Sequence, residues 1–222
     1  MRTFATIAAL AAGLALSACA GAPVEQASRN APVPGQGTAD EASQPGRLIA
    51  PEAMHIASVR VRVPRELTVS EANRFYPGGD IVWREDPKGD RHEQVRRVVE
   101  AGIMEGVRGL GDTGRAAVLD IEVSRFHALT EKARRSTGGV HAIQFTMQMR
   151  DAETGAPLGE PKFVKADFKA LGGQEAARAE AQGLTQKVRI TRHLAQVIRT
   201  ELADPQGYHA ANLGLIGALN QL

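Results

Sequence analysis

Cysteine, aromatic residues and long apolar runs are all scarce in this sequence of 222 residues. The single cysteine, Cys19, excludes an internal disulfide framework, because one thiol has no partner within the chain. Aromatic residues make up 4% of the chain and the formal net charge is only +2, which does not indicate a nucleic-acid-binding protein. The apolar run at 4–16 is shorter than the roughly 20 residues that a membrane-spanning helix needs. These absences direct attention to the cysteine itself.

The position of Cys19 indicates its role. Arg2 and the uncharged apolar run at 4–16 have the form of a signal peptide, with a basic start and an apolar centre. The end of this run resembles the lipobox of bacterial lipoproteins, which here reads Leu16, Ser17, Ala18 and Cys19. The resemblance implies that residues 1–18 are removed as a signal peptide, that Cys19 carries lipid, and that the folded part has no free thiol.

The residues after Cys19 indicate a destination and a tether. Ala20 stands where an aspartate retains lipoproteins in the inner membrane of well-studied enteric bacteria, so the resemblance implies the periplasmic face of the outer membrane. Residues 19–46 are rich in Pro, Gly, Ala, Ser and Gln and contain no aromatic residue. Such a segment buries too little apolar surface to offset its ordering entropy. We therefore expect a flexible, lipidated tether.

Residues 47–204 are sufficient for one domain, and their patterns predict an α+β fold. Alternation of apolar and polar residues predicts strands at 55–63, 116–129, 140–150 and 162–171. Helical spacing predicts one helix after Asp90, before the second strand, and another at 174–202. We expect a two-layer domain in which two helices cover an antiparallel sheet of about four strands. Residues 205–222 are expected to form a weak helix or a disordered tail.

Two features of the helices can be predicted in detail. Asp90, followed by Glu93 three residues later, has the pattern of a capping box and marks the start of the first helix. The last helix is expected to turn one apolar seam towards the sheet. This seam consists of Leu184, Val188, Thr191, Ala195, Ile198 and Leu202.

Two short motifs resemble binding sites but lack the required context. GLGDTG at 109–114 has the glycine spacing of a dinucleotide-binding loop, yet a helix precedes it and a strand follows, which reverses the order that such a site needs. We interpret it as a helix stop and a turn. His92 and Glu93 begin a zinc-protease pattern in which Arg96 replaces the second histidine. We therefore expect no nucleotide, cofactor or metal site.

His127 and His141 form a more interesting pair. If the second and third predicted strands form a hairpin centred near Arg134, the two imidazoles face each other, with Cβ atoms about 5 Å apart. Such a pair could share a metal or respond to pH, but two ligands without a third are more typical of a polar strand end. No nucleophile-elbow or phosphate-loop motif is present, and we expect no enzymatic activity. The alternative is an envelope hydrolase with a site assembled from Trp83, Asp86, His127 and His141.

The segment 75–91 is the candidate binding surface. It is a long connection that contains Tyr76, Trp83 and Arg84, and aromatic and arginine side chains are typical of binding hot spots. Two interpretations stay open. In one the segment is a recognition surface with Trp83 at least partly exposed, and in the other the indole of Trp83 fills an open end of the core.

Four longer segments together resemble an uncharacterised family of small bacterial lipoproteins. They read PGGDIVWREDPKGDR, LDIEVSRFHALTEKARRSTGGVHAIQF, DAETGAPLGEP and QKVRITRHLAQVIRTEL. The resemblance implies lipoprotein status and one domain, and it supplies no catalytic residue. We therefore expect a non-enzymatic module, anchored to the membrane through Cys19, that binds another envelope protein or assists envelope assembly or transport. Neither nucleic acid nor nucleotide is an expected partner.

Overall fold

The structure, a computed structural model, describes residues 53–213. The predicted signal peptide, Cys19, the predicted tether and residues 214–222 of the predicted tail lie outside the described residues. Within 53–213, none of the helices is long and apolar enough to cross a membrane. In chain order the elements are β1 (Met54–Arg62), β2 (Ile81–Val82), α1 (Arg91–Val107), β3 (Arg115–His127), α2 (Glu131–Arg134), β4 (Gly139–Asp151), β5 (Lys162–Lys165), β6 (Phe168–Ala170), α3 (Gly173–Ala181) and α4 (Gln186–Ala203).

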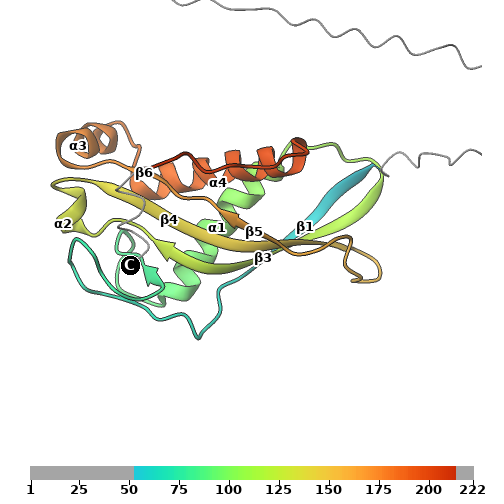
Figure 1. Ribbon diagram of the computed structural model, residues 1–222, viewed down its shortest axis with the longest axis horizontal. Coiled ribbons are helices and arrows are strands. Elements are labelled where there is room, and N and C mark those ends of the chain that lie inside the picture. The colour runs from blue at the N-terminus through green and yellow to red at the C-terminus, as the bar shows by residue number, and fades with distance from the viewer. Residues whose placement is uncertain (1–52, 214–222) are drawn as a thin grey trace, which may run out of the picture. The chain divides into compact units, whose positions relative to one another are not determined.

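The predicted α+β class is confirmed. The main path of the sheet runs β1-β3-β4-β5, with β2 paired to β3 and β6 paired to β4. The long helices α1 and α4 lie side by side along one face of this sheet (Figure 1). The core lies between this pair of helices and the sheet, where apolar side chains of β3 and β4 pack against those of α1 and α4. Its largest members include Leu119, Ile121, Phe145, Ile103 and Leu194.

The direction of β1 differs from the predicted antiparallel sheet. β1 runs parallel to β3, with Val59 opposite Leu119 and Val61 opposite Ile121. The β3–β4 and β4–β5 pairs are antiparallel, as predicted. Because α1 lies between β1 and β3 in the chain, it carries the chain back to the end of the sheet where β1 began, and the two strands then run the same way. The sheet is therefore mixed.

The ends of α1 agree with the predicted signals. The carboxylate of Asp90 accepts a hydrogen bond from the backbone N–H of Glu93, at 3.2 Å, and so caps the helix. Only this half of the predicted capping box forms among the described residues, because the carboxylate of Glu93 binds Arg96 one turn later instead of the backbone N–H of Asp90. The GLGDTG segment connects α1 to β3, with Gly109 at φ +81° and Gly114 at φ +94°, which is the predicted stop and turn.

The predicted last helix is interrupted, and its buried face is rotated. α3 ends and α4 begins on either side of Gly183, whose φ of +75° favours glycine. Ala195 and Ile198 are buried as predicted, whereas the other four residues of the predicted seam are only partly buried. Since α4 contacts α1 as well as the sheet, it buries a wider stripe than a single seam. The buried positions of α4 are Gln186, Ile190, Leu194, Ala195, Val197 and Ile198.

The predicted strand at 162–171 is also interrupted. β5 and β6 are separated by Ala166 and Asp167. The Asp167 carboxylate accepts a hydrogen bond from the backbone N–H of Ile143 at 3.0 Å, and so replaces a carbonyl oxygen of the ladder. Burial raises the pKa of this carboxyl group. The buried side chain of Asp167 therefore replaces a backbone hydrogen bond of the sheet between β5 and β6.

Two glycines allow α1 and α4 to approach closely. A Cβ atom on Gly102 would lie 2.7 Å from the Cβ of Leu194, and one on Gly106 would lie 2.8 Å from the backbone oxygen of Ala195. The spacing of four residues places both glycines on one side of α1. The backbone of α4 therefore occupies the space that side chains would need.

Replacing Gly106 with alanine is expected to destabilise the domain. The new methyl group would meet a backbone oxygen, which no side-chain rotation can move, and such overpacking costs about 1–3 kcal/mol. Alanine favours the helix by about 1 kcal/mol, which offsets only part of this cost. Thermal denaturation measures the difference, with Gly159→Ala as the control, because a Cβ there meets open space. A Gly106→Ala protein that melts at or above the wild-type temperature would contradict the close helix contact.

Candidate functional site

His127 and His141 do not face each other, which corrects the prediction. Along most of the β3–β4 hairpin the register is the predicted one, with Leu119 opposite Met149. A bulge after Val123 then adds one residue to β3, so that His127 lies opposite Ala142. A shift of one residue moves side chains to the other face of a sheet, so the two histidines point to opposite faces.

Each histidine has its own buried surroundings. His127 Nε2 lies 2.7 Å from the carbonyl oxygen of Gly79, and burial lowers the pKa of this imidazole to about 4. His141 is completely buried beside Phe168, with the ring centroids 4.8 Å apart, and burial lowers its pKa to about 3. Phe168 in turn stacks on His193 of α4 at 4.0 Å. Among the described residues, neither ring nitrogen of His141 has a hydrogen-bond partner.

The four groups of the hydrolase alternative are not brought together. Trp83 Nε1 donates a hydrogen bond to Asp86 Oδ2 at 2.8 Å, but His127 and His141 are held in the separate surroundings given above. Burial on its own would raise the pKa of Asp86. The hydrogen bonds from Lys187 and Trp83 together outweigh burial, so the pKa of Asp86 lies below its ordinary value. In the part of the chain that the structure describes, no three His, Cys, Asp or Glu residues form a group suited to a metal ion.

Trp83 is a core residue rather than a surface residue. Its side chain has no exposed area, and its ring contacts that of Phe126 edge to face, with the centroids 5.7 Å apart. The hydrogen bond to Asp86 satisfies the indole N–H. Of the two interpretations of 75–91, the structure shows the one in which the indole fills the core, and a direct binding contact by Trp83 is excluded.

Arg84 is a brace between two segments, not a free contact residue. Its Nε donates to Glu131 of α2 at 2.6 Å, and its Nη1 lies 3.3 Å from the carboxylate of Glu71. The hydrogen bond to Glu131 raises the pKa of Arg84. Arg91, which sequence analysis missed, is buried and also binds Glu71, at 2.7 Å, as well as the backbone oxygen of Asp86. The two arginines thus link Glu71, which lies in the connection between β1 and β2, to α1 and α2.

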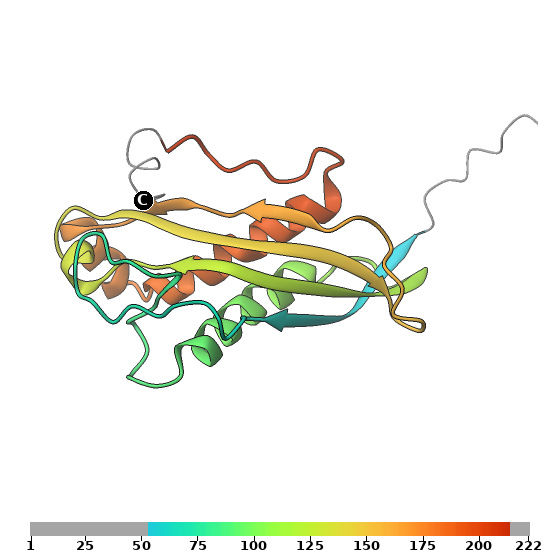
Figure 2. The same cartoon turned by 60° about the horizontal axis from the view of Figure 1, so that its bottom comes forward.

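Tyr76 lies on an exposed surface that two distant segments build. Tyr76 and Phe75 are 68% and 43% exposed, which is unusual for adjacent aromatic residues. The connection before β2 lies beside α2, at the end of the sheet opposite the start of β1 (Figures 1 and 2). We call this the tip surface, and it comprises Arg74, Phe75, Tyr76, Lys132 and Arg135, all of which are exposed.

Hydrogen bonds fasten the two halves of the tip surface together. Thr130 Oγ1 donates to the backbone oxygen of Arg74 at 2.7 Å, and the backbone N–H of Lys132 donates to Asn73 Oδ1 at 2.9 Å. The ammonium group of Lys132 lies 4.8 Å from the centre of the Phe75 ring, a cation–π distance. Sequence analysis missed the three cations, because the contacts that join Arg74 and Lys132 across the surface span more than 50 residues, and no local pattern reports such contacts.

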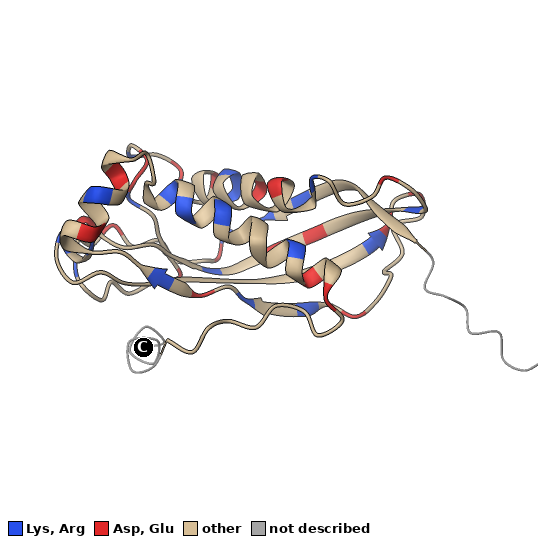
Figure 3. Ribbon diagram, turned by 90° about the horizontal axis from the view of Figure 1, so that it is seen from above, with Lys and Arg blue, Asp and Glu red and all other residues tan. Residues whose placement is uncertain are grey.

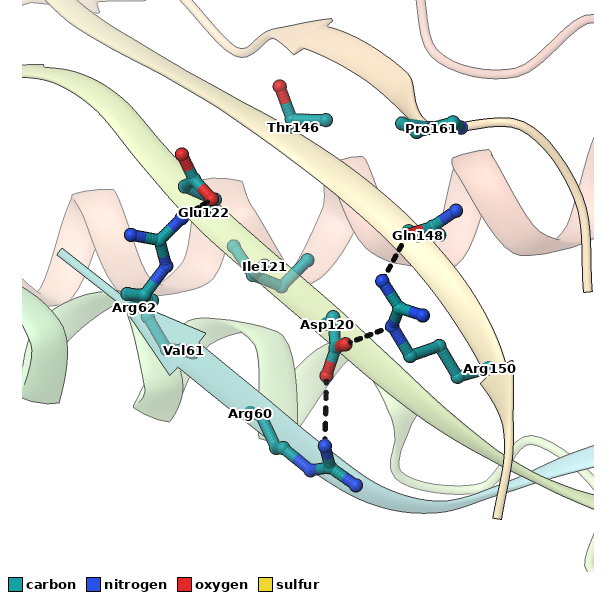
Figure 4. Close-up of a pocket in the computed structure, with 10 residues that line it drawn as sticks. All are labelled: Arg60, Val61, Arg62, Asp120, Ile121, Glu122, Thr146, Gln148, Arg150 and Pro161. Carbon is teal, nitrogen blue, oxygen red and sulfur yellow. Dashed lines mark hydrogen bonds and ion pairs between the residues drawn. The ribbon is translucent and has the colours of Figure 1, made fainter. Parts of the chain in front are cut away.

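A shallow groove on the sheet face away from the helices is the other candidate. Its volume is about 440 Å³, and β1, β3 and β4 supply most of its lining (Figure 4). Arg62 pairs with Glu122, and Arg150 Nε lies 2.7 Å from Asp120. Both carboxylates are therefore bound by arginines of neighbouring strands, an arrangement that is typical of a solvated sheet face. The helices also carry charges of both signs (Figure 3).

A model described as a family of unknown function (DUF6778) matches residues 54–218. Among solved structures, a minor lipoprotein from Acinetobacter baumannii is 15% identical with a TM-score of 0.32, and the match covers 69% of this chain and 97% of that one. A protein of family DUF330 from Xanthomonas campestris is 11% identical with a TM-score of 0.39, over 77% and 90% of the two chains. No curated protein matches this chain. Likenesses this distant transfer no function.

Proposed function

We propose, from the premise that this chain belongs to the family of unknown function DUF6778, that it is a lipid-anchored periplasmic protein that binds another envelope protein. The anchor is the lipid on Cys19, and the membrane is the outer membrane, at its periplasmic face. The lipobox sequence, Leu16 to Cys19, supports the anchor, and Ala20 after the cysteine supports the destination. Because two or three acyl chains hold a protein far more durably than one, such an anchor gives stable membrane attachment.

The tip surface is the observation that supports binding. Two adjacent exposed aromatic rings and three exposed cations are unusual for a solvated loop but are the composition of protein interfaces, in which Tyr, Phe and Arg are enriched. The connection between β1 and β2, which carries Phe75 and Tyr76, is also held in place because Arg84 and Arg91 bind Glu71 within it. This order exists before any partner binds, which lowers the entropic cost of binding.

The same contacts support a role without catalysis. Of the four groups of the hydrolase alternative, Asp86 is bound by Trp83 and Lys187. His127 and His141 are buried with depressed pKa values and lie on opposite faces of the sheet. We therefore propose a binding role, in envelope assembly or transport.

Photo-crosslinking from the tip surface in living cells tests this proposal. A photoreactive phenylalanine analogue at Tyr76 of the full-length protein is expected to form an adduct of defined size. The same analogue at Glu153, which is exposed in the turn between β4 and β5, serves as the control and is expected to form none. Equal adducts from both positions, or none from Tyr76, would contradict a binding role for the tip surface.

Replacing Cys19 with serine is expected to abolish lipid attachment, because a hydroxyl group is a much weaker nucleophile than a thiolate towards the diacylglyceryl donor. The variant should accumulate as a precursor with its signal peptide, and should carry no lipid by mass spectrometry. Ser17→Ala keeps a small residue in the lipobox and should mature normally. A Cys19→Ser protein that is still cleaved after Ala18 and lipidated would refute the anchor.

A further inference from the structure

We infer that the partner meets the tip surface with an acidic segment of protein. This inference rests on the proposed function and names the chemistry of the partner at the same surface. Arg74, Lys132 and Arg135 are exposed cations, and the residues at 53–213 provide none of them with an ion pair. Three unpaired positive charges within one small surface repel one another, and a complementary negative charge would relieve that repulsion.

Two acidic side chains close in sequence to these cations are already bound by other arginines. Glu71 is bound by Arg84 and Arg91, and Glu131 is bound by Arg84. The hydrogen bond from Arg91 lowers the pKa of Glu71, and the hydrogen bond from Arg84 lowers the pKa of Glu131, so both carboxylates stay ionised and occupied. Glu71 and Glu131 thus neutralise Arg84 and Arg91. The exposed cations of the tip surface are left without a carboxylate partner among residues 53–213.

Hydrogen bonds hold together the backbone segments that carry the exposed cations. The backbones of Arg74 and Lys132 are joined through the hydrogen bonds to Thr130 and Asn73. Arg135 follows Lys132 by three residues on the same helical turn, a spacing that places both side chains on one side of α2. The aromatic rings of Phe75 and Tyr76 lie in the same surface. A partner therefore meets positive side chains on joined backbone segments, beside two aromatic rings.

This composition favours an acidic protein segment over an anionic membrane. Protein segments that recognise anionic lipids generally cluster about 4–8 Lys or Arg residues, which exceeds the three present here. Arginine binds carboxylates with two parallel hydrogen bonds, and a neighbouring aromatic ring accepts an apolar side chain. The segment that fits would carry two or three Asp or Glu residues beside one apolar residue.

Charge reversal combined with the Tyr76 crosslink tests the inference in the full-length lipidated protein. The double variant Arg74→Glu with Arg135→Glu is expected to reduce the adduct by about tenfold or more, because like charges would then oppose each other. The matched control is Arg178→Glu with Arg192→Glu, two exposed arginines on α3 and α4, which is expected to change the adduct by less than about twofold. Melting temperatures of both double variants should equal that of the wild type, because all four side chains are exposed.

The outcomes separate the inference from the proposed function. An adduct that persists in the Arg74→Glu, Arg135→Glu protein supports binding but overturns an acidic partner. An adduct with lipid instead of protein overturns a protein partner, and the absence of any wild-type adduct overturns both proposals. Mass spectrometry of the crosslinked peptide should find more Asp and Glu than Lys and Arg, and a neutral or basic peptide would also overturn the inference.

Discussion

Replacement of Trp83 with alanine is expected to lower the free energy of unfolding by about 3–5 kcal/mol, the usual cost of truncating a fully buried aromatic side chain. The indole has no exposed area, contacts Phe126 edge to face and belongs to the main core. Its removal would leave a cavity between β2 and the rest of the core, and Asp86 would lose one hydrogen-bond donor while keeping Lys187. Urea denaturation of the purified domain measures the loss.

Two further variants separate packing from recognition. Trp83→Phe keeps an aromatic ring in the core but removes the N–H group, so it should cost clearly less than alanine. Tyr76→Ala removes an exposed ring, so it should change the free energy of unfolding by less than about 0.5 kcal/mol. It should nevertheless weaken the binding of the partner to the tip surface. A Trp83→Ala protein as stable as the wild type would show that the indole does not fill the core.

Acidification is expected to destabilise the domain steeply between about pH 6.5 and pH 4. Burial lowers the pKa of His127 to about 4, that of His141 to about 3 and that of His193 to about 4, whereas histidines of the unfolded chain titrate near 6.5. In this interval the unfolded state binds more protons than the folded state, so stability is fully present above pH 6.5 and is lost as the pH falls towards the folded pKa values.

The magnitude follows from the number of protons. Each histidine contributes at most about 1.4 kcal/mol per pH unit, and the contributions of His127 and His193 end near pH 4, whereas that of His141 continues to about pH 3. Arg189 adds to the effect, because its positive charge also lowers the pKa of His141 and of His193. Asp167 opposes it, since its raised pKa favours the folded state on acidification. Urea midpoints at pH 7, 6, 5 and 4 measure the slope.

His141→Phe is the informative variant for this prediction. It keeps a planar ring beside Phe168 and removes two buried nitrogens that have no partner within 53–213. An unpartnered buried polar atom costs about 1–3 kcal/mol, so the variant should be at least as stable as the wild type at pH 7 and should show a shallower pH slope. His209→Gln, at an exposed position, is the control and should leave the slope unchanged. An unchanged slope in His141→Phe would mean that His141 does not couple folding to protons.

The sequence alone determined the features that depend on neighbouring residues. Alternating side chains identified β3 and β4, and the Asp90 cap placed the start of α1, because strand faces and helix caps are set within a few residues. The hairpin register was also predictable as far as Val123, since two long alternating strands can bury their apolar faces together in few ways. The lipobox is a contiguous signal of the same local kind.

The tertiary structure alone decided the features that depend on residues far apart in the chain. The direction of β1 depends on where α1 returns the chain, and one bulge after Val123 moved His127 to the face opposite His141. Composition made Trp83 and Arg84 candidates for a binding surface, but packing against Phe126 buried the first and ion pairs engaged the second. Only folding brought Tyr76 beside α2, because the hydrogen bonds that join those segments span more than 50 residues and no local pattern encodes them.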